Sequence, residues 1–457
     1  MDYSILSRSY DLRGIYGTDI DDDFFFRLGY AFAQVTEKKR IALGYDARLS
    51  AIPLKTAFTR WANLAGATII DIGLCSSDML SFATCHYADI EAWVMITASH
   101  NPKEYNGMKS LSHTSEPYNL KKYGPDMIRV MESMREISEY TITDSIEHRS
   151  VVEDWTDHIL DFIGRDVDLS TYRIVADGGN GAAGAFMSRL AEKAWFELIP
   201  LFLEPDGNFP HHHPNPMLEK NRLDAQAALR EHGAGMAFIF DGDADRVMVL
   251  DDSGELIGSG IISSMIVEEL QQKYPNATYI GNANISHIFA DTVKSVGGVY
   301  EKEMVWHVYI REHMMKDSSI VYAWEHSAHY FFRDNYYMDS GIMAAMVLLA
   351  SVVRKSQKLS EVVMRYQKYI TLEETNFHVQ DPKLAMQKLR EIYAHDNPFF
   401  LDGITVEYPD GSWWNFRPSS NEPLLRFNME AITQERFDEL YSEIIAHIRT
   451  FGTSSSD

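Results

Sequence analysis

The feature that most constrains the fold is a series of short apolar stretches, each of which stops at a polar loop. Residues 92–96 are all apolar and lead into a loop that presents Ser99. Apolar runs of this length, bounded by turn residues, are typical of strands buried on both faces of an α/β sheet. Further strands are predicted over residues 41–43, 67–72, 173–176, 236–240, 278–281 and 320–324.

Apolar residues at helical spacing lie between these predicted strands. Leu54, Phe58, Trp61 and Ala65 follow that spacing, and Gly66 marks the end of the predicted helix. Strands that alternate with helices predict mostly parallel sheets. We also expect a helix in the charged stretch over residues 118–149. Residues 342–353 predict a buried core helix that is too short to span a membrane.

The length of 457 residues exceeds what one hydrophobic core usually supports, so two to four domains are expected. One α/β unit is predicted over residues 1–150. The strand and helix pattern restarts near Tyr172 and again near Asp251. From about Tyr369 it changes to an α+β pattern.

The net charge limits which binding partners are expected, and the cysteine content indicates the cellular compartment. The formal net charge is −24, with 66 acidic against 42 basic residues, which argues against affinity for nucleic acid or anionic membranes. Two cysteines suit a reducing compartment, and the first residues lack the basic and apolar regions of a signal peptide. We therefore expect a soluble cytoplasmic protein that binds neither nucleic acid nor membrane.

Three alternating carboxylates, Asp241, Asp243 and Asp245, follow the predicted strand over residues 236–240. In an extended turn they can converge on one cation, and an all-carboxylate set favours a hard ion such as Mg²⁺. An EF-hand is excluded because Arg246 stands where its loop needs glycine. A solvated acidic turn is the alternative. A magnesium site of this kind needs an anionic partner, and phosphate is the usual one.

Ser99 is a candidate nucleophile at the end of a strand, where ligands of α/β sheets bind. One role for such a nucleophile is in a Ser-His-Asp hydrolase, but the G-x-S-x-G motif of those enzymes is absent around Ser99. A phosphorylated Ser99 beside the metal explains more of the sequence. Lys109 could then stabilise charge or transfer a proton, although it could equally be a surface lysine.

Other polar groups lie far away in the sequence. Arg417, Ser419, Ser420 and Asn421 form a cluster of donors that suits phosphate oxygens, or an ordinary polar turn. Glu325, Ser327 and His329 alternate after a strand, as groups facing sugar hydroxyls would, although His329 could be a core histidine. The triple histidine over residues 211–213 is flanked by prolines, which favours a rigid loop over a metal site.

Together these motifs resemble the α-D-phosphohexomutase family, and most closely its bacterial phosphomannomutase/phosphoglucomutase branch. The matching segments occur in the family's order and extend over almost the whole chain. They are residues 9–14 (SYDLRG), 97–102 (TASHNP), 105–109 (YNGMK), 206–210 (DGNFP), 214–216 (PNP), 241–246 (DGDADR), 325–329 (EHSAH) and 417–423 (RPSSNEP).

The resemblance implies four domains around a central cleft. Three are related α/β domains with mixed sheets, expected over residues 1–150, 151–250 and 251–368, and the fourth is a C-terminal α+β domain over residues 369–457. The first three would carry the phosphoserine, metal and sugar-binding loops, and the fourth the phosphate-binding loop. We expect a monomer or homodimer whose last domain moves about a hinge.

The reaction implied by the resemblance interconverts hexose 6-phosphate and hexose 1-phosphate, with mannose and/or glucose as the sugar. It proceeds through a phosphoserine at Ser99 and a hexose 1,6-bisphosphate, which also serves as activator. A phosphoserine oxygen would join the three aspartates in holding Mg²⁺. The residues around the transferring phosphoryl group would be Arg13, His100, Lys109 and Arg246. The substrate-binding set would comprise Glu325, Ser327, His329, His307, Arg417, Ser419, Ser420 and Asn421.

Several positions depart from the family's pattern. Trp324 replaces the glycine before Glu325, and the loop over residues 417–421 has Ser and Asn where Asn and Thr are more common. Met304 stands where a lysine is expected, Trp306 where a glycine is expected, and Asn284 at a position that is usually basic. The loops expected to contact substrate have thus lost cations and gained bulk. The alternative function is therefore a phosphosugar-binding paralogue with weak or altered mutase activity.

Overall fold

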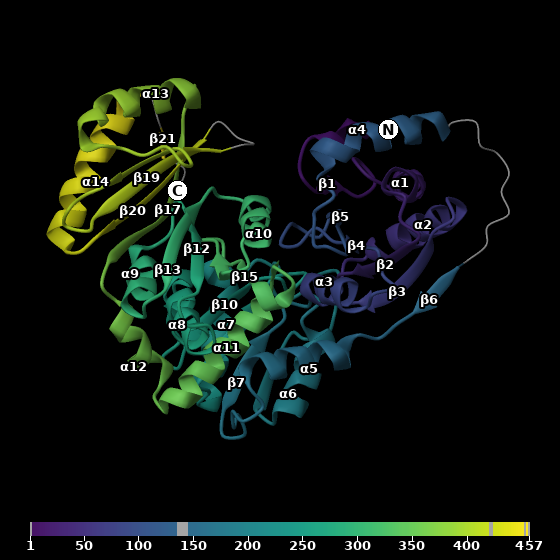
Figure 1. Cartoon of the computed structure of the whole chain (residues 1–457), viewed down its shortest axis with the longest axis horizontal. Helices are drawn as coiled ribbons and strands as arrows, with labels where there is room; N and C mark the ends of the chain where they lie inside the picture. The colour runs from purple at the N-terminus through teal and green to yellow at the C-terminus, as the bar shows by residue number, and fades with distance from the viewer. Residues whose placement is uncertain (1, 135–144, 420–423, 452–453, 456–457) are drawn as a thin grey trace. The chain divides into compact units, whose positions relative to one another are not determined.

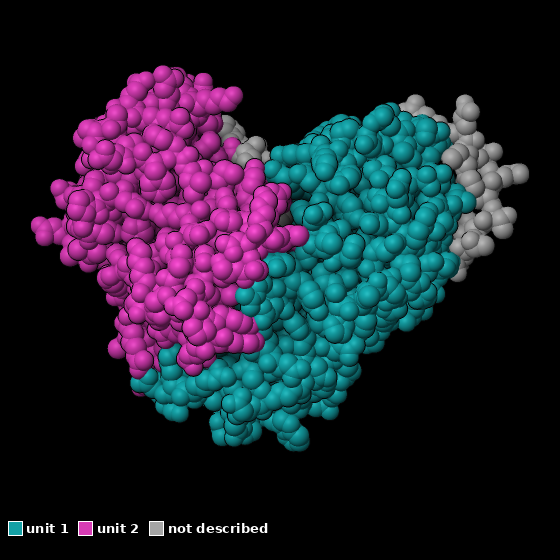
Figure 2. Space-filling view, in the orientation of Figure 1, with its two compact units in different colours: residues 1–257, 330–360 teal, residues 258–329, 361–457 magenta. Residues whose placement is uncertain are grey.

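A computed structural model describes residues 2–134, 145–419, 424–451 and 454–455. The chain divides into two compact units (Figure 2). Unit 1 comprises residues 1–257 and 330–360, and unit 2 comprises residues 258–329 and 361–457. The four domain boundaries expected from the sequence remain predictions.

The first sheet of unit 1 is mixed (Figure 1). Its strands, in spatial order, are β1 (Leu12–Ile15), β5 (Tyr105–Ser112), β4 (Ala92–Ile96), β2 (Arg40–Tyr45), β3 (Thr68–Leu74) and β6 (Ile146–His148). From β4 to β6 neighbouring strands run parallel, whereas β5 is antiparallel to both β1 and β4. Ser99 therefore follows the carboxyl end of a central strand.

Helices cover both faces of this sheet. Ile41 and Leu43 of β2 belong to the same core as the apolar side chains of α1 (Asp22–Thr36), α2 (Ala51–Leu64) and α4 (Leu120–Ser133). Ala42, between them, is also buried and lies on the other face, where α3 (Ser77–His86) packs on β2 and β4. Burial on both faces explains why these strands are continuous apolar runs. A short 3₁₀ helix, η1 (Tyr3–Ser7), precedes β1.

The helix expected over residues 118–149 is shorter than predicted. It extends over Leu120–Ser133 only, and Ile146–His148 form strand β6 instead. All three residues of β6 are exposed, so this edge strand is held by backbone pairing with β3 and has no apolar pattern to reveal it. Residues 135–144 lie outside the described residues.

The second sheet of unit 1 is also mixed. Its strands, in order, are β11 (Leu256–Ile257), β10 (Val247–Asp251), β9 (Met236–Phe240), β7 (Arg173–Asp177) and β8 (Glu197–Leu201). The helices of this part are α5 (Val152–Ile163), α6 (Gly184–Ala194), α7 (Leu223–His232) and α11 (Gly341–Lys355). The remaining elements are η3 (Glu219–Arg222), β15 (Tyr330–Phe332), η4 (Arg333–Asn335) and β16 (Met338–Asp339). Helix α11 is the predicted buried core helix.

Unit 2 contains a parallel group of strands in the order β13 (Val299–Glu303), β12 (Thr278–Asn282) and β14 (Ile320–Trp324). Its helices are α8 (Ser259–Lys273), α9 (His287–Ser295) and α10 (His307–Lys316). A short connection, α12 (Leu359–Val363) and η5 (Met364–Tyr366), leads to the C-terminal part.

The C-terminal part of unit 2 is an antiparallel sheet that packs against two helices. The strands, in order, are β18 (Ile404–Glu407), β19 (Trp413–Pro418), β20 (Leu424–Ala431), β17 (Ile370–His378) and β21 (Ser454–Ser455). The helical elements are α13 (Pro382–Ile392), η6 (Ala394–Asp396) and α14 (Gln434–Arg449), and apolar residues of α13, α14 and the sheet share one core. The predicted class, α/β domains followed by an α+β domain, is confirmed. Within the described residues, each helix is too short or too polar to cross a lipid bilayer.

Candidate active site

Ser99 lies in the loop after β4, and its backbone has a conformation that residues with a Cβ atom rarely adopt. Its φ angle is +48°, in the left-handed region. The Ser99 hydroxyl donates a hydrogen bond to Asp241 Oδ2 at 2.7 Å and lies 3.3 Å from Nδ1 of His100. Strain of this kind at a reactive group is a feature of functional sites.

The acidic loop joins β9 to β10, which form an antiparallel pair. Asp241 and Asp243 are fully buried, Asp245 nearly so, and one carboxylate oxygen from each lies within 4.8 Å of the others. The three carboxylates therefore converge, and they belong to the same unit as Ser99.

Gly242 allows the acidic loop to approach the Ser99 loop closely. A Cβ atom on Gly242 would lie 2.5 Å from the carbonyl oxygen of Ser99, which is closer than real contacts permit. On the other side, the Ala182 N–H donates to the Gly242 carbonyl at 3.0 Å. The loop is thus held between two backbone segments, and a side chain at residue 242 would displace it.

Three cationic side chains line this cluster. Lys109 Nζ lies 2.7 Å from Asp243 Oδ2 and 2.6 Å from Asp245 Oδ2. Arg246 pairs with Asp241 at 2.9 Å and also donates to Nδ1 of His100.

Arg13, the third cation, extends from β1. Its guanidinium pairs with Asp11 at 2.9 Å and donates to Asn101 Oδ1, in the Ser99 loop, at 3.3 Å. The structure thus brings together Ser99, the four residues predicted around the transferring group and the three aspartates predicted as metal ligands.

The local electrostatics keep the cations charged and the histidine neutral. Burial opposes the charge on Lys109, but the carboxylates of Asp243 and Asp245 outweigh it and raise the pKa of the lysine. Burial, with the nearby charge of Arg246, lowers the pKa of His100 to about 2. A neutral His100 can accept a hydrogen bond at Nδ1, which faces the Ser99 hydroxyl. Burial and the charge of Asp245 raise the pKa of Asp241.

The donor set of the acidic loop fits a hard divalent cation. All candidate ligand atoms are carboxylate oxygens, the type that Mg²⁺ prefers. Asp243 Oδ1 is buried and has no hydrogen-bond partner among the described residues. A buried oxygen of this kind is costly unless something binds it. The three aspartates could therefore hold a metal ion.

Three residues near the site, Asp46, Arg48 and Ser77, belong to no recognised motif and were not predicted from the sequence. Arg48 and Asp46, in the loop between β2 and α2, hydrogen-bond to the Ser99 loop. Ser77, at the start of α3, donates from Oγ to Asp243 Oδ2 at 2.5 Å. The available signal was their position after strands β2 and β3, because ligand sites gather at the carboxyl ends of strands.

Glu325, in unit 2, is buried in the turn after β14. Its carboxylate accepts hydrogen bonds from the Trp306 N–H at 2.9 Å and from Asn282 Nδ2 at 3.2 Å. Its own N–H donates to the carbonyl of His329 at 2.9 Å. Glu325, Ser327 and His329 therefore lie in a turn, directly after a strand, that this bond closes. Ser327 and His329 are half-buried, and His307 is the first residue of α10.

Trp306 and Met304, two of the positions that depart from the family's pattern, lie beside this turn. Trp306 has a φ of +135°, a value at which non-glycine residues are strained. The Met304 carbonyl faces Asn282 Nδ2 at 3.5 Å. Asn284 is buried, and its Nδ2 lies 3.5 Å from Asn428 Oδ1 on β20.

Arg417 lies on β19 with a second arginine beside it. Arg417 and Arg426 are register partners on neighbouring strands, and they share the carboxylate of Glu374, at 3.0 and 2.7 Å. The pair therefore keeps a net positive charge. Ser419 follows the strand directly, whereas the predicted Ser420 and Asn421 lie outside the described residues.

The three consecutive histidines do not share one site. His211 contacts Asn180, His212 contacts the buried carboxylate of Asp177 at 3.2 Å, and the His213 carbonyl accepts from Asn221. The three histidines thus attach the proline-flanked loop to three different residues. Such contacts favour a structural role for this loop over a metal site.

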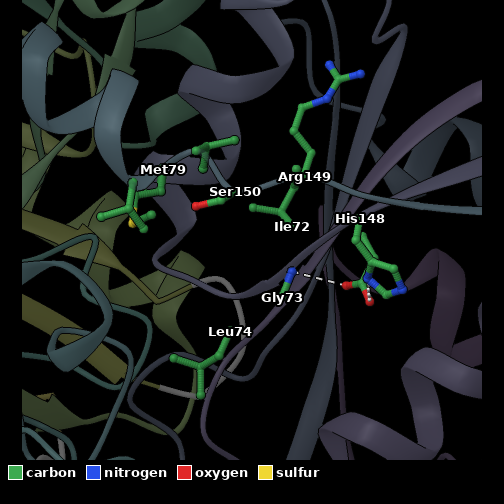
Figure 3. Close-up of a pocket in the computed structure, with 10 residues that line it drawn as sticks. Ile72, Gly73, Leu74, Met79, His148, Arg149 and Ser150 are labelled. Atoms are coloured by element: carbon green, nitrogen blue, oxygen red, sulfur yellow. Dashed lines mark hydrogen bonds and ion pairs between the residues drawn. The ribbon is translucent and has the colours of Figure 1, made fainter.

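A hollow of about 250 Å³ lies elsewhere in unit 1, between the end of β3 and the start of α5 (Figure 3). Its charged side chains are engaged with other parts of the protein. Asp71 pairs with Lys55 at 2.5 Å, and the Arg149 guanidinium pairs with Asp89 at 2.8 Å. The residues that line it include none of those predicted for the site.

Comparisons with known proteins match most of the chain. Four family models, described as phosphoglucomutase/phosphomannomutase alpha/beta/alpha domains I, II and III and C-terminal domain, match residues 4–122, 153–254, 259–369 and 374–447. A protein of Xanthomonas campestris named "Phosphohexose mutases" is 32% identical over 427 residues, covering 93% of this chain and 94% of that protein. A phosphomannomutase of Vibrio cholerae is 33% identical, covering 95% and 96%.

Solved structures agree with this similarity. The crystal structure of a phosphoglucomutase/phosphomannomutase family protein from Burkholderia thailandensis has a TM-score of 0.88 and is 26% identical. The match covers 100% of this chain and 99% of that one.

Proposed function

The chain belongs to the phosphoglucomutase/phosphomannomutase family of enzymes, and on that premise we propose that it interconverts hexose 6-phosphate and hexose 1-phosphate. The proposed sugar is mannose and/or glucose. The phosphoryl group passes through Ser99 and a hexose 1,6-bisphosphate intermediate. The observation that carries the proposal is the hydrogen bond from the Ser99 hydroxyl to Asp241, inside a cluster of three carboxylates and three cations.

In the proposed cycle, phosphorylated Ser99 gives its phosphoryl group to the free hydroxyl of a hexose monophosphate. The bond between phosphorus and Ser99 Oγ breaks and a bond to the sugar oxygen forms. The proton of the sugar hydroxyl ends on Ser99 Oγ, which becomes a free hydroxyl again. The bisphosphate turns round and returns its other phosphoryl group to Ser99. Free hexose 1,6-bisphosphate is the proposed activator because it restores phosphoserine that has been lost.

The chain's own residues would supply charge and position. Lys109 and Arg246 place fixed positive charges beside Ser99, and Arg13 adds a third next to Asn101. Such preorganised charge favours the transition state of phosphoryl transfer. Asp241, Asp243, Asp245 and a phosphoserine oxygen would hold Mg²⁺, which neutralises phosphoryl charge. His100, kept neutral by burial and by the charge of Arg246, would accept the hydrogen bond from Arg246 at Nδ1 and so help to position that cation beside Ser99.

Substrate binding is assigned to unit 2. Glu325, Ser327, His329 and His307 would contact the sugar, and Arg417 with Ser419, Ser420 and Asn421 would hold the phosphate that does not react. The net charge of −24 supports an enzyme that binds neither nucleic acid nor membrane, and the low cysteine content suits the cytoplasm. The proposed enzyme of small phosphosugars is a monomer or a homodimer.

Mass spectrometry and an isomerisation assay test this proposal. The purified protein should carry one phosphoryl group on Ser99 and should isomerise mannose 1-phosphate or glucose 1-phosphate when catalytic bisphosphate is present. Ser99→Ala should lose nearly all turnover while its fold, checked by circular dichroism, is kept. Isomerisation by Ser99→Ala at the wild-type rate would contradict the assignment of Ser99.

A second candidate function is phosphosugar binding with weak or altered mutase activity. It is favoured by the strained Trp306, the uncharged Met304 and the buried Asn284 in the loops assigned to the sugar. Under this alternative, sugar phosphates bind, and neither glucose 1-phosphate nor mannose 1-phosphate is isomerised.

A further inference from the structure

Side chains hold the Ser99 backbone at both of its polar groups. The Ser99 N–H donates to Thr97 Oγ1 at 2.8 Å, and the Ser99 carbonyl accepts from Arg48 Nη2 at 2.7 Å. The residue between these two bonds has the φ of +48°. A non-glycine residue keeps a left-handed conformation only where its surroundings enforce it. The two bonds supply that enforcement.

The Arg48 guanidinium is fully buried, and all three of its nitrogens donate. Nη2 also bonds to the Asn101 carbonyl at 2.7 Å, and Nη1 bonds to the carbonyls of Pro102 and Tyr105 at 2.6 and 3.0 Å. One side chain therefore ties four carbonyls of the segment that contains Ser99. The planar, five-donor group of arginine suits this task, whereas a lysine has three donors on a single atom.

Asp46 joins the two ends of this network. Its Oδ2 accepts from Arg48 Nε at 3.1 Å and from Thr97 Oγ1 at 2.7 Å. A continuous path thus leads from the Ser99 N–H through Thr97, Asp46 and Arg48 back to the Ser99 carbonyl. Phe209, whose ring centroid is 5.5 Å from the guanidinium, covers the network.

We propose that Arg48 is a positioning residue for phosphoryl transfer: its guanidinium holds Ser99 in the left-handed conformation that directs Oγ toward Asp241. The inference rests on the proposed role of Ser99. Arg48 donates to carbonyl oxygens and Asp46 and is itself buried, so its loss should misdirect Ser99 without removing a substrate contact. Displacements of about 1 Å can slow a reaction about 100-fold, because the reacting atoms no longer align.

Arg48→Lys is the first test, with Thr97→Val as a nearly isosteric second variant that removes the two bonds of Thr97 Oγ1, to the Ser99 N–H and to Asp46. Both should lower kcat by about 100-fold while KM changes by less than about threefold. In a crystal structure of Arg48→Lys, residue 99 should leave the left-handed region. Free guanidinium should restore part of the lost kcat in Arg48→Ala.

Arg354→Lys is the matched control. Arg354 also donates to a carbonyl, that of Ile163 at 2.7 Å, near the end of α11. It lies about 20 Å along the helix from Gly341, which packs against Arg246. This control should keep the wild-type kcat.

The outcomes separate the inference from the proposed function. A wild-type protein without phosphoserine at Ser99 and without mutase activity refutes the function, whatever Arg48 does to the loop. With an active wild type, an unchanged kcat in both Arg48→Lys and Thr97→Val overturns the inference, as does a raised KM at constant kcat. Should Arg48→Lys fail to fold, the kcat and KM of Thr97→Val decide.

Discussion

Lys109 occupies the position of a counter-ion for two buried carboxylates. Its ammonium lies within 2.7 Å of both Asp243 and Asp245, and the lysine side chain is 19% exposed. Three converging carboxylates repel one another in a poorly solvated site unless positive charge balances them. A single side chain can therefore serve the catalytic charge balance and the stability of the metal-free fold at once.

Replacing Lys109 by methionine should separate these two effects. In the presence of a chelator, Lys109→Met should lower the free energy of unfolding by about 3 kcal/mol, because buried charges lose their partner. Added Mg²⁺ should restore much of that loss, since it supplies the missing positive charge. Denaturant unfolding with and without Mg²⁺ measures both values. Equal stability of wild type and variant under chelation would contradict the assigned charge balance.

The candidate catalytic residues were predicted because they lie in contiguous motifs. Ser99 and the three aspartates follow predicted strands, whereas Lys109 belongs to the motif over residues 105–109, where no strand was predicted. Arg48 was missed because its partners are mainly backbone carbonyls, which have no sequence signature. Ser77 was missed because its contact with Asp243 joins residues 166 positions apart.

At the scale of elements, the first turn of α3 connects two parts of unit 1. Ser76 caps the helix, Ser77 bonds to Asp243 through both its N–H and its hydroxyl, and Asp78 accepts from Ser340 at 2.6 Å. Ser340 in turn caps α11. One helix end therefore supports the acidic loop and fixes the start of a second helix.

Ser77→Ala should weaken metal-dependent activity. It removes the hydroxyl that orients the Asp243 carboxylate, and loss of such outer contacts typically costs about 10- to 100-fold in metal affinity or activity. A titration of activity with Mg²⁺ should show a higher half-saturating concentration. Thr84→Val in the same helix is the control, because its hydroxyl donates only to the Leu80 carbonyl among the bonds of the described residues.

Gly242→Ala tests the close approach of the acidic loop to the Ser99 loop. The new methyl group would lie 2.5 Å from the Ser99 carbonyl, so the two loops must separate. We expect kcat to fall by about 100-fold through lost alignment, with secondary structure unchanged by circular dichroism. Gly258→Ala is a matched control, since a Cβ there meets nothing within 4 Å. Wild-type turnover in Gly242→Ala would show that the loops do not need this spacing.

Strands and helices were predicted well where burial imposes a periodic pattern, as in β4, β9 and α2. The prediction failed at β6, where three exposed residues pair through backbone bonds alone. The conformation of the turn after β14 was not predicted. There the Glu325 N–H bonds to the His329 carbonyl and closes the chain, which alternation of polar residues cannot reveal.

At the scale of the whole molecule, the proposed function divides its tasks between the two units. Ser99, the acidic loop and their three cations belong to unit 1, whereas Arg417 and Glu325 belong to unit 2. The charge of the Arg417 and Arg426 pair is balanced only in part by Glu374. Anion binding at Arg417 should therefore not depend on a metal held by the aspartates.

Removal of the metal should consequently abolish turnover and spare substrate binding. We expect chelation to lower the isomerisation rate at least about 1,000-fold, because the phosphoryl charge is no longer neutralised. The dissociation constant for glucose 6-phosphate, measured by calorimetry on the same sample, should change by less than about tenfold. Arg417→Ala should instead lose glucose 6-phosphate binding, both with and without Mg²⁺. Loss of glucose 6-phosphate binding on chelation alone would show that the metal and the distal phosphate are recognised together.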